Sequence, residues 1–187
     1  MASIHDLTPG IWDLDPAHTT VGFVGRHLMI TKVRGRFSGV TGTVTVPEDR
    51  LQSSVTATID MASVDTRDDS RDAHLRNEDF FDVERHPTMT FTSTEVRQDG
   101  GDFVLVGDLT IKGVTRSVEL DLDFDGVSGD PWGGTRAGFT AKGEINRKDW
   151  GLEWNVALET GGVLVGEKVK IELDVQVVHH VEEPANA

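Results

Sequence analysis

The sequence predicts an all-β domain, a closed antiparallel barrel of about eight strands with a short helical segment across one end. Apolar and polar side chains alternate along most of the 187 residues, which is the period of strands with one dry and one wet face. Turn sequences rich in glycine, proline and aspartate divide this alternation into separate strands. The alternation stops once, from Thr66 to Phe81, where a helix is expected. A barrel with a covered mouth suggests holding a ligand more than transforming one.

Length and composition favour one undivided domain. A patterned chain of 187 residues with 37% apolar residues fits one barrel or sandwich with one core. The net charge of −14 argues against nucleic acid and anionic membrane surfaces as general partners, and the chain has no cysteine. The first residues lack the basic start and apolar run of a secretory leader, and no stretch is long enough to span a bilayer. We therefore expect a cytoplasmic protein without an integral membrane segment.

The clearest strand runs from Val114 to Phe124, where every second residue is apolar except Arg116. Residues 103–111 alternate in the same way, and Gly113 supplies the turn of a long hairpin. The other strand candidates are residues 21–26, 34–46, 54–60, 88–97, 135–146 and 169–178.

Strands of this length either stack as two sheets or close on themselves, and the pattern alone does not separate a sandwich from a barrel. Closure removes the exposed strand edges that promote aggregation. Glycines inside the strand patterns indicate bulges or bends of a curved sheet and favour the barrel. They are Gly39, Gly42, Gly107, Gly138 and Gly143.

The segment from Thr66 to Phe81 predicts a short helix. Residues 68–70, Asp-Asp-Ser, offer N-caps for a helix that carries His74, Leu75 and Phe81. Phe80 and Phe81 either close one end of the core or line an entrance for a ligand, and both interpretations stay open.

Several motifs, in one order along the chain, resemble the YceI-like family. The first group is WDLDPAH at residues 12–18, VGF at 21–23, RH at 26–27 and GRF at 35–37. The second is DAHL at 72–75, DFFD at 79–82 and HP at 86–87. The third is GDLTIKGVT at 107–115, AGF at 137–139 and RKDWGL at 147–152.

The resemblance implies a lipocalin-like, elongated antiparallel barrel over residues 12–178, with an extension at 1–11 and a tail at 179–187. Its apolar interior would hold a long isoprenoid chain, an isoprenoid quinone or another long-chain lipid. The resemblance further implies a homodimer and no catalytic residues. Many members carry a secretory leader and work in the periplasm, whereas this sequence shows none, so its location and ligand are less defined than its fold.

Candidate ligand contacts are chosen by side-chain alternation and by their place in these motifs. The expected apolar lining is Phe23, Phe37, Phe91 and Phe139, with Phe80 and Phe81 as the cap and Trp150 at the barrel end. The expected polar donors at the mouth are His18, His27, His74 and Arg147. A histidine in such a domain is also well explained as a hydrogen-bonded structural residue.

Two other classes of function remain as alternatives. An isomerase or hydrolase acting on a hydrophobic substrate would need convergent polar groups inside the cavity, and Arg116 is the one clear interruption of an apolar face. Stacking of a sugar would use Trp132, Trp150 or Trp154. No cofactor is expected, and the net charge already argues against a nucleic acid partner. No metal site is expected either, since the adjacent His179 and His180 point to opposite faces of a strand.

Charge is unevenly distributed along the chain. No acidic residue lies between Pro16 and Pro47, a stretch that contains Arg26, Lys32, Arg34 and Arg36. The last three alternate with apolar residues, so we expect them on the solvated outer face.

Overall fold

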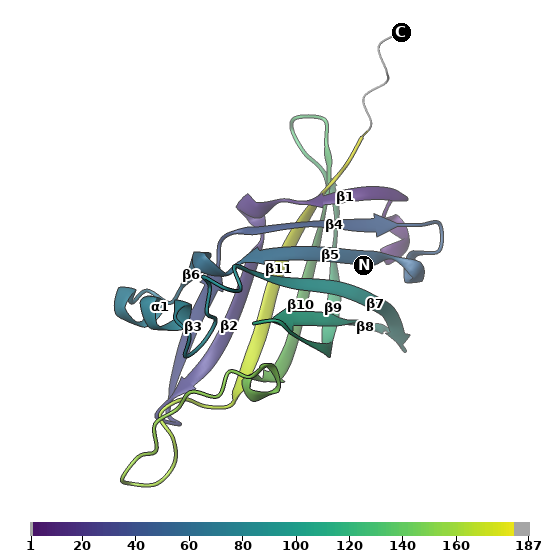
Figure 1. Ribbon diagram of the computed structural model, residues 1–187. Coiled ribbons are helices and arrows are strands. Elements are labelled where there is room, and N and C mark those ends of the chain that lie inside the picture. The colour runs from purple at the N-terminus through teal and green to yellow at the C-terminus, as the bar shows by residue number, and fades with distance from the viewer. Residues whose placement is uncertain (1, 182–187) are drawn as a thin grey trace.

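Antiparallel strands close into a barrel in the computed structural model, which describes residues 2–181 (Figure 1). The strands are β1 (Gly10–Leu14), β2 (Thr20–His27), β3 (Thr31–Phe37), β4 (Val40–Val46), β5 (Ser54–Asp60), β6 (Val64–Asp65), β7 (Thr88–Asp99), β8 (Asp102–Ile111), β9 (Val114–Gly129), β10 (Thr135–Asn146) and β11 (Lys168–His179). The helix α1 (Asp69–Arg76) is joined by the short 3-10 helices η1 (Ile4–Asp6), η2 (Pro16–His18), η3 (Arg50–Gln52), η4 (Met61–Ser63) and η5 (Arg147–Trp150).

The ring of the barrel runs β1-β4-β5-β7-β8-β9-β10-β11 and returns to β1. Closure is made where Trp12 of β1 lies opposite His179 of β11. The eight-stranded antiparallel barrel is therefore confirmed, and the sandwich that the pattern left open is excluded. The long hairpin is also confirmed, because β8 and β9 pair along their length around a turn at Lys112 and Gly113.

β1 and β2 both pair with β11, at different positions along it. β11 pairs with β2 through Lys170 to Asp174 and with β1 nearer its end, so β1 and β2 follow one another along the same neighbour. β3 pairs with β2, and β6 pairs with β3. The prediction of one strand over residues 34–46 is wrong, because β3 ends at Phe37 and β4 begins at Val40, with Ser38 and Gly39 between them. A Cβ on Gly39 would lie 2.8 Å from that of Asp60, so this glycine allows the close approach.

The predicted helix is confirmed as α1, but it is shorter than the interruption of the strand pattern. The Asp68 side chain caps it by accepting the N–H of Arg71, and the helix ends at Arg76. Phe80 and Phe81 therefore lie in the segment that follows the helix. β1 and β6 were not expected, and residues 4–11, which the sequence left as an extension, form η1 and the start of β1.

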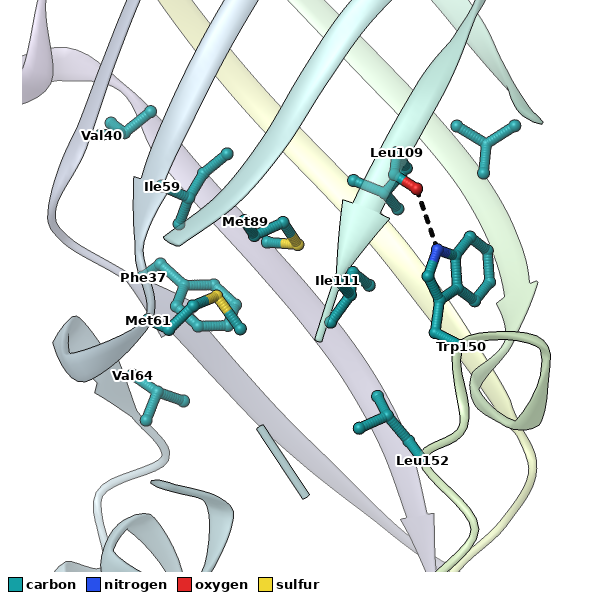
Figure 2. Packing of buried hydrophobic residues seen from close by; sticks show 11 residues of the cluster. Phe37, Val40, Ile59, Met61, Val64, Met89, Leu109, Ile111, Trp150 and Leu152 are labelled. Atoms are coloured by element: carbon teal, nitrogen blue, oxygen red, sulfur yellow. Dashed lines mark hydrogen bonds between the residues drawn. The ribbon is translucent and has the colours of Figure 1, made fainter. Parts of the chain in front are cut away.

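Buried side chains gather in two clusters at different levels of the barrel. The larger includes Phe37, Met61, Met89 and Trp150, and Figure 2 shows the Trp150 indole N–H donating to the Leu109 carbonyl at 2.9 Å. The smaller surrounds Trp12 and Val177 and includes Leu7 from the N-terminal segment. A cavity lies inside the barrel, and members of both clusters line it.

Candidate functional site

A cavity of about 900 Å³ occupies the interior of the barrel. Its wall is built by alternation, since each strand contributes every second residue, as Val169, Ile171, Leu173 and Val175 do from β11. At about 3.4 Å per residue these four side chains form an apolar wall about 20 Å long. The cavity is therefore long and hydrophobic.

Two phenylalanines lie flat against the wall because glycines face them. A Cβ on Gly35 would clash with the ring of Phe23 from the neighbouring strand, and a Cβ on Gly107 would clash with the ring of Phe91. Each ring thus occupies the space that a side chain on the neighbouring strand would take. This arrangement keeps aromatic surface on the wall while leaving the lumen open.

The predicted contact residues lie on the cavity wall, with two exceptions. Those on the wall are Phe23, His27, Phe37, His74, Phe80, Phe81, Phe91, Phe139 and Arg147. His18 is exposed and lies beside Asp15, and Trp150 is buried in the protein core, so neither belongs to the lining. That the wall residues touch a ligand stays a prediction.

Arg147 holds a loop in place. Its side chain is only 4% exposed, and its guanidinium donates to the carbonyls of Gly166, Leu152 and Val165. Burial lowers the pKa of Arg147 below its ordinary value, while the charge of Glu167 acts in the opposite direction. With its donors directed at the backbone, Arg147 fixes the loop of residues 152–166 and is poorly suited to bind a head group.

Three aromatic rings join α1 and the segment after it to the loop of residues 152–166. The ring of Trp154 lies 4.6 Å from that of His74 and 5.4 Å from that of Phe80, and His74 meets Phe80 at 5.0 Å. His74 is also oriented by Asp79, at 2.9 Å from its Nε2. Trp154 lines the cavity. The sequence offered it for sugar stacking but not as a lipid contact, because it lies in a loop without alternation.

The exposed part of the lining marks the mouth. Apart from Ser54 at the start of β5, it comprises Arg26 and His27 at the end of β2, and Asp68, Ser70 and Arg71 at the start of α1. Arg71 is held by the hydroxyl and carbonyl of Thr66 at 2.7 Å. Asp72, which is buried, accepts the N–H and hydroxyl of the same threonine. The mouth is therefore polar and ordered, whereas the interior is apolar.

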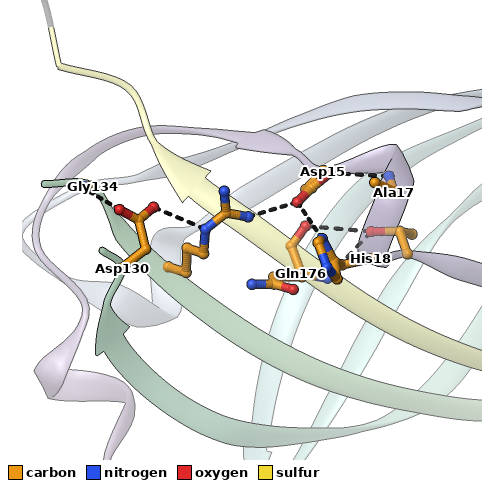
Figure 3. Close-up of polar contacts among 8 residues, drawn as sticks. Asp15, Ala17, His18, Asp130, Gly134 and Gln176 are labelled. Atoms are coloured by element: carbon orange, nitrogen blue, oxygen red, sulfur yellow. Dashed lines mark hydrogen bonds and ion pairs between the residues drawn. The ribbon is translucent and has the colours of Figure 1, made fainter. Parts of the chain in front are cut away.

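A polar network connects the segment between β1 and β2 to β10 (Figure 3). Arg136 of β10 reaches Asp15 at 2.6 Å and Asp130 at 2.9 Å, and Asp15 lies 2.8 Å from the ring of His18. Hydrogen bonds from His18 and Arg136 lower the pKa of Asp15. The backbone N–H of Gly134, with Arg136, lowers the pKa of Asp130, and both carboxylates raise the pKa of Arg136. His18 therefore belongs to a structural network.

Buried polar side chains in the described part of the chain are paired within the protein. Among residues 2–181 every buried side-chain nitrogen or oxygen has a hydrogen-bond partner, and nowhere in that range do three His, Cys, Asp or Glu gather around a common metal position. Arg116, the polar group expected on the apolar face, is exposed and lies outside the lining. Helices in the described part of the chain are too short or too polar to span a bilayer. The wall of the cavity is elongated and largely apolar.

Comparison with known proteins identifies relatives over most of the chain. The YceI-like domain matches residues 12–177. A UPF0312 protein of Staphylococcus epidermidis is 40% identical over 163 residues, covering 86% of this chain and 93% of its own length.

Solved structures share the same barrel. BcnA of Burkholderia cenocepacia is 25% identical with a TM-score of 0.71, covering 87% of this chain and 98% of BcnA. A polyisoprenoid binding domain from Saccharophagus degradans, implicated in plant cell wall breakdown, is 17% identical with a TM-score of 0.69. It covers 90% of this chain and 98% of that domain, and at this identity the likeness concerns the fold.

Proposed function

This chain belongs to the YceI-like family, and from that membership and its hollow barrel we propose that it binds a long-chain lipid of the isoprenoid type without transforming it. The observation that carries the proposal is the apolar cavity of about 900 Å³. Small-molecule sites span roughly 300–1,000 Å³, so this cavity has room for a large ligand. Its wall is continuous along one strand from Val169 to Val175, which suits an extended chain better than a compact one.

The energetics favour a flexible apolar chain. Each methylene moved from water into a dry site contributes about 0.8 kcal/mol before the cost of ordering the chain is subtracted. The same reasoning extends to an isoprenoid quinone whose head group stays at the polar mouth.

The fold neighbour from Saccharophagus degradans is named as a polyisoprenoid binding domain, which gives a precedent for this ligand class in a barrel of this shape. Membership of the family and the largely apolar lining of the cavity support binding over catalysis. Transport, storage and sequestration all use such a site. A homodimer and a cytoplasmic location stay predictions of the sequence.

Blocking the lumen tests the proposal. Ala57 lines the cavity from β5, facing Phe91 on the neighbouring strand, so Ala57→Phe places a ring where the lipid chain would lie. We expect the lipid that copurifies with the protein to fall by about tenfold or more, because an overfilled site loses its contacts with the chain. Native mass spectrometry and solvent extraction would measure bound mass and also subunit number.

The matched control is Thr58→Phe, which adds the same ring to the outer face of the same strand. Its lipid content should equal that of the parent protein. Equal lipid content in Ala57→Phe and the parent would show that the lumen is not the binding site. Turnover of a hydrophobic ester or isomerisable lipid by the parent protein would favour the enzymatic alternative.

A further inference from the structure

An apolar turn projects beside the mouth of the cavity. Leu28, Met29 and Ile30, together called the hairpin tip, join β2 to β3 and are 40%, 58% and 78% exposed. Single exposed hydrophobic residues are ordinary, but three in succession at a turn form a patch that usually marks an interaction.

The backbone of the hairpin tip adopts a conformation that large side chains disfavour. Leu28 and Met29 have φ of 54° and 60°, and the Ile30 N–H donates to the His27 carbonyl at 3.1 Å. Two left-handed residues in such a turn favour Asn-Gly, and large side chains there are unfavourable. The turn therefore keeps apolar side chains exposed where polar or small residues would be more stable.

The hairpin tip is bonded to the rim of the cavity. The Leu28 N–H donates to the Leu164 carbonyl at 2.8 Å, and the Gly166 N–H donates to the Arg26 carbonyl at 3.0 Å. Arg26, Leu164 and Gly166 all line the cavity. Val156, 46% exposed, adds apolar surface from the loop that lies beside the tip at the lower end of Figure 1. Whatever covers the tip therefore also meets the mouth.

We propose that the hairpin tip inserts into the surface of a lipid bilayer and brings the cavity mouth against the membrane from which the lipid is taken. A second copy of the chain is a poorer occupant, because a stable protein interface uses about 20–30 residues from each side. A convex tip of a few side chains is too small for that, yet it suits a fluid interface that closes around it.

Charge favours approach in this orientation. Arg26 and Lys32 flank the hairpin tip, and no acidic residue lies between Pro16 and Pro47. The net charge of −14 opposes contact through the rest of the surface, but charges farther than about 8 Å are screened at physiological salt. Glu159 in the neighbouring loop and Asp68 at the mouth offset part of the positive charge, so apolar insertion is the main driving force and the cations add to it.

Sedimentation of the full chain with vesicles of phosphatidylcholine and phosphatidylglycerol in equal parts tests the proposal. The affinity of the double variant Met29→Asn with Ile30→Thr for these vesicles should be lower by about tenfold or more, because apolar side chains drive the insertion. Asparagine tolerates positive φ, so the melting temperature should stay equal or rise. Lys32→Gln should weaken binding to these vesicles and leave binding to phosphatidylcholine alone unchanged.

Trp132→Ser is the matched control, since Trp132 is 83% exposed in the turn between β9 and β10, at the other end of the barrel in Figure 1. It should bind vesicles like the parent protein. Absence of vesicle binding by the parent, or unchanged binding by the double variant, would overturn the proposal. A parent dimer that the double variant converts to a monomer would also overturn it, by assigning the tip to a second copy.

The docking proposal rests on the proposed function for its cargo, and the two fail separately. Ala57→Phe should lose bound lipid and still sediment with vesicles, whereas the double variant should keep its lipid and lose sedimentation. Lipid retention by Ala57→Phe with normal sedimentation would contradict the lumen as the binding site and leave the docking surface supported.

Discussion

Two glycines facing phenylalanines help decide how much of the barrel stays hollow. Phe23 lies over Gly35, and Phe91 lies over Gly107, where the carbonyl of Thr92 is also within 2.8 Å of the Cβ position. At Gly35 the three nearest atoms all belong to the movable ring of Phe23, whereas at Gly107 one of them is the backbone oxygen of Thr92. The two positions should therefore respond differently to substitution.

Gly35→Ala should push the ring of Phe23 into the lumen. We expect weaker binding of long-chain lipids, with a small change in melting temperature, because the ring can rotate while the strand stays paired. Competition between short and long isoprenoid alcohols for the purified protein would measure the change. Gly25→Ala is the control, since Gly25 also lines the cavity from β2 and a Cβ there meets nothing within 4 Å. Loss of long-chain binding in both variants would show that displacement of the Phe23 ring is not its cause.

At the scale of elements, two segments without regular strand pairing lie beside the end of β2 at the mouth. The segment around α1 and the loop of residues 152–166 meet through His74, Phe80 and Trp154. Arg147 then ties the loop to the end of β10 through backbone carbonyls. The loop is thus positioned by aromatic contacts with the α1 segment on one side and by the buried Arg147 on the other.

Replacing Arg147 by methionine should loosen this loop. Buried carbonyls that lose their donor cost about 1–3 kcal/mol, so the free energy of unfolding in urea should fall by that order. Hydrogen exchange at residues 152–166 should rise before exchange in the strands does. Lys148→Met is the control, because Lys148 is half-exposed and pairs only with Glu167 on the surface, a contact worth about 1 kcal/mol or less. Equal stability of the two variants would show that Arg147 does not hold the loop.

Elements with long alternation were predictable, and short or interrupted ones were not. β9 was evident because its period persists from Val114 to Phe124, and α1 because Asp68 is a strong N-cap. β1 was missed because five residues before Pro16 carry little periodic signal. The break at Gly39 was hidden because the alternation continues on both sides of it.

In the candidate site, residues that follow side-chain alternation were predictable, and those placed by contacts between distant segments were not. Side-chain alternation placed Phe23, Phe37 and Phe91 on the inner face, where the structure finds them. The motif that contains Trp150 gave no indication that its indole would bond to the Leu109 carbonyl from the core. That contact joins residues far apart in the sequence, so only the fold could reveal it.

For the whole molecule, acid should weaken closure of the barrel. Asp15, Asp130 and Glu167 have pKa values lowered in the folded chain, chiefly by hydrogen bonds involving His18, Gly134 and Lys148 respectively. A carboxyl with a lowered folded pKa stabilises the fold above its unfolded pKa, near 4, and this contribution is lost as pH falls through the folded value. Stability should therefore be steady from about pH 7 to pH 5 and decline below about pH 4.

Thermal unfolding across this pH range measures the effect, and Arg136→Gln provides the comparison. Without the guanidinium, the pKa values of Asp15 and Asp130 should rise, so the decline on acidification should be smaller than in the parent protein. Parallel acid profiles for the two proteins would show that the network around Arg136 does not couple closure to pH.

The sequence by itself determined the strand period, the turns, the helix and the family, because these depend on neighbours within a few residues along the chain. Only the tertiary structure decided that the interior is hollow. Alternation specifies which side chains face inward but not whether they meet, since that depends on the curvature of eight paired strands and on rings such as Phe23 lying against glycines of another strand. The space left for a ligand is a property of contacts between distant segments, which no local pattern records.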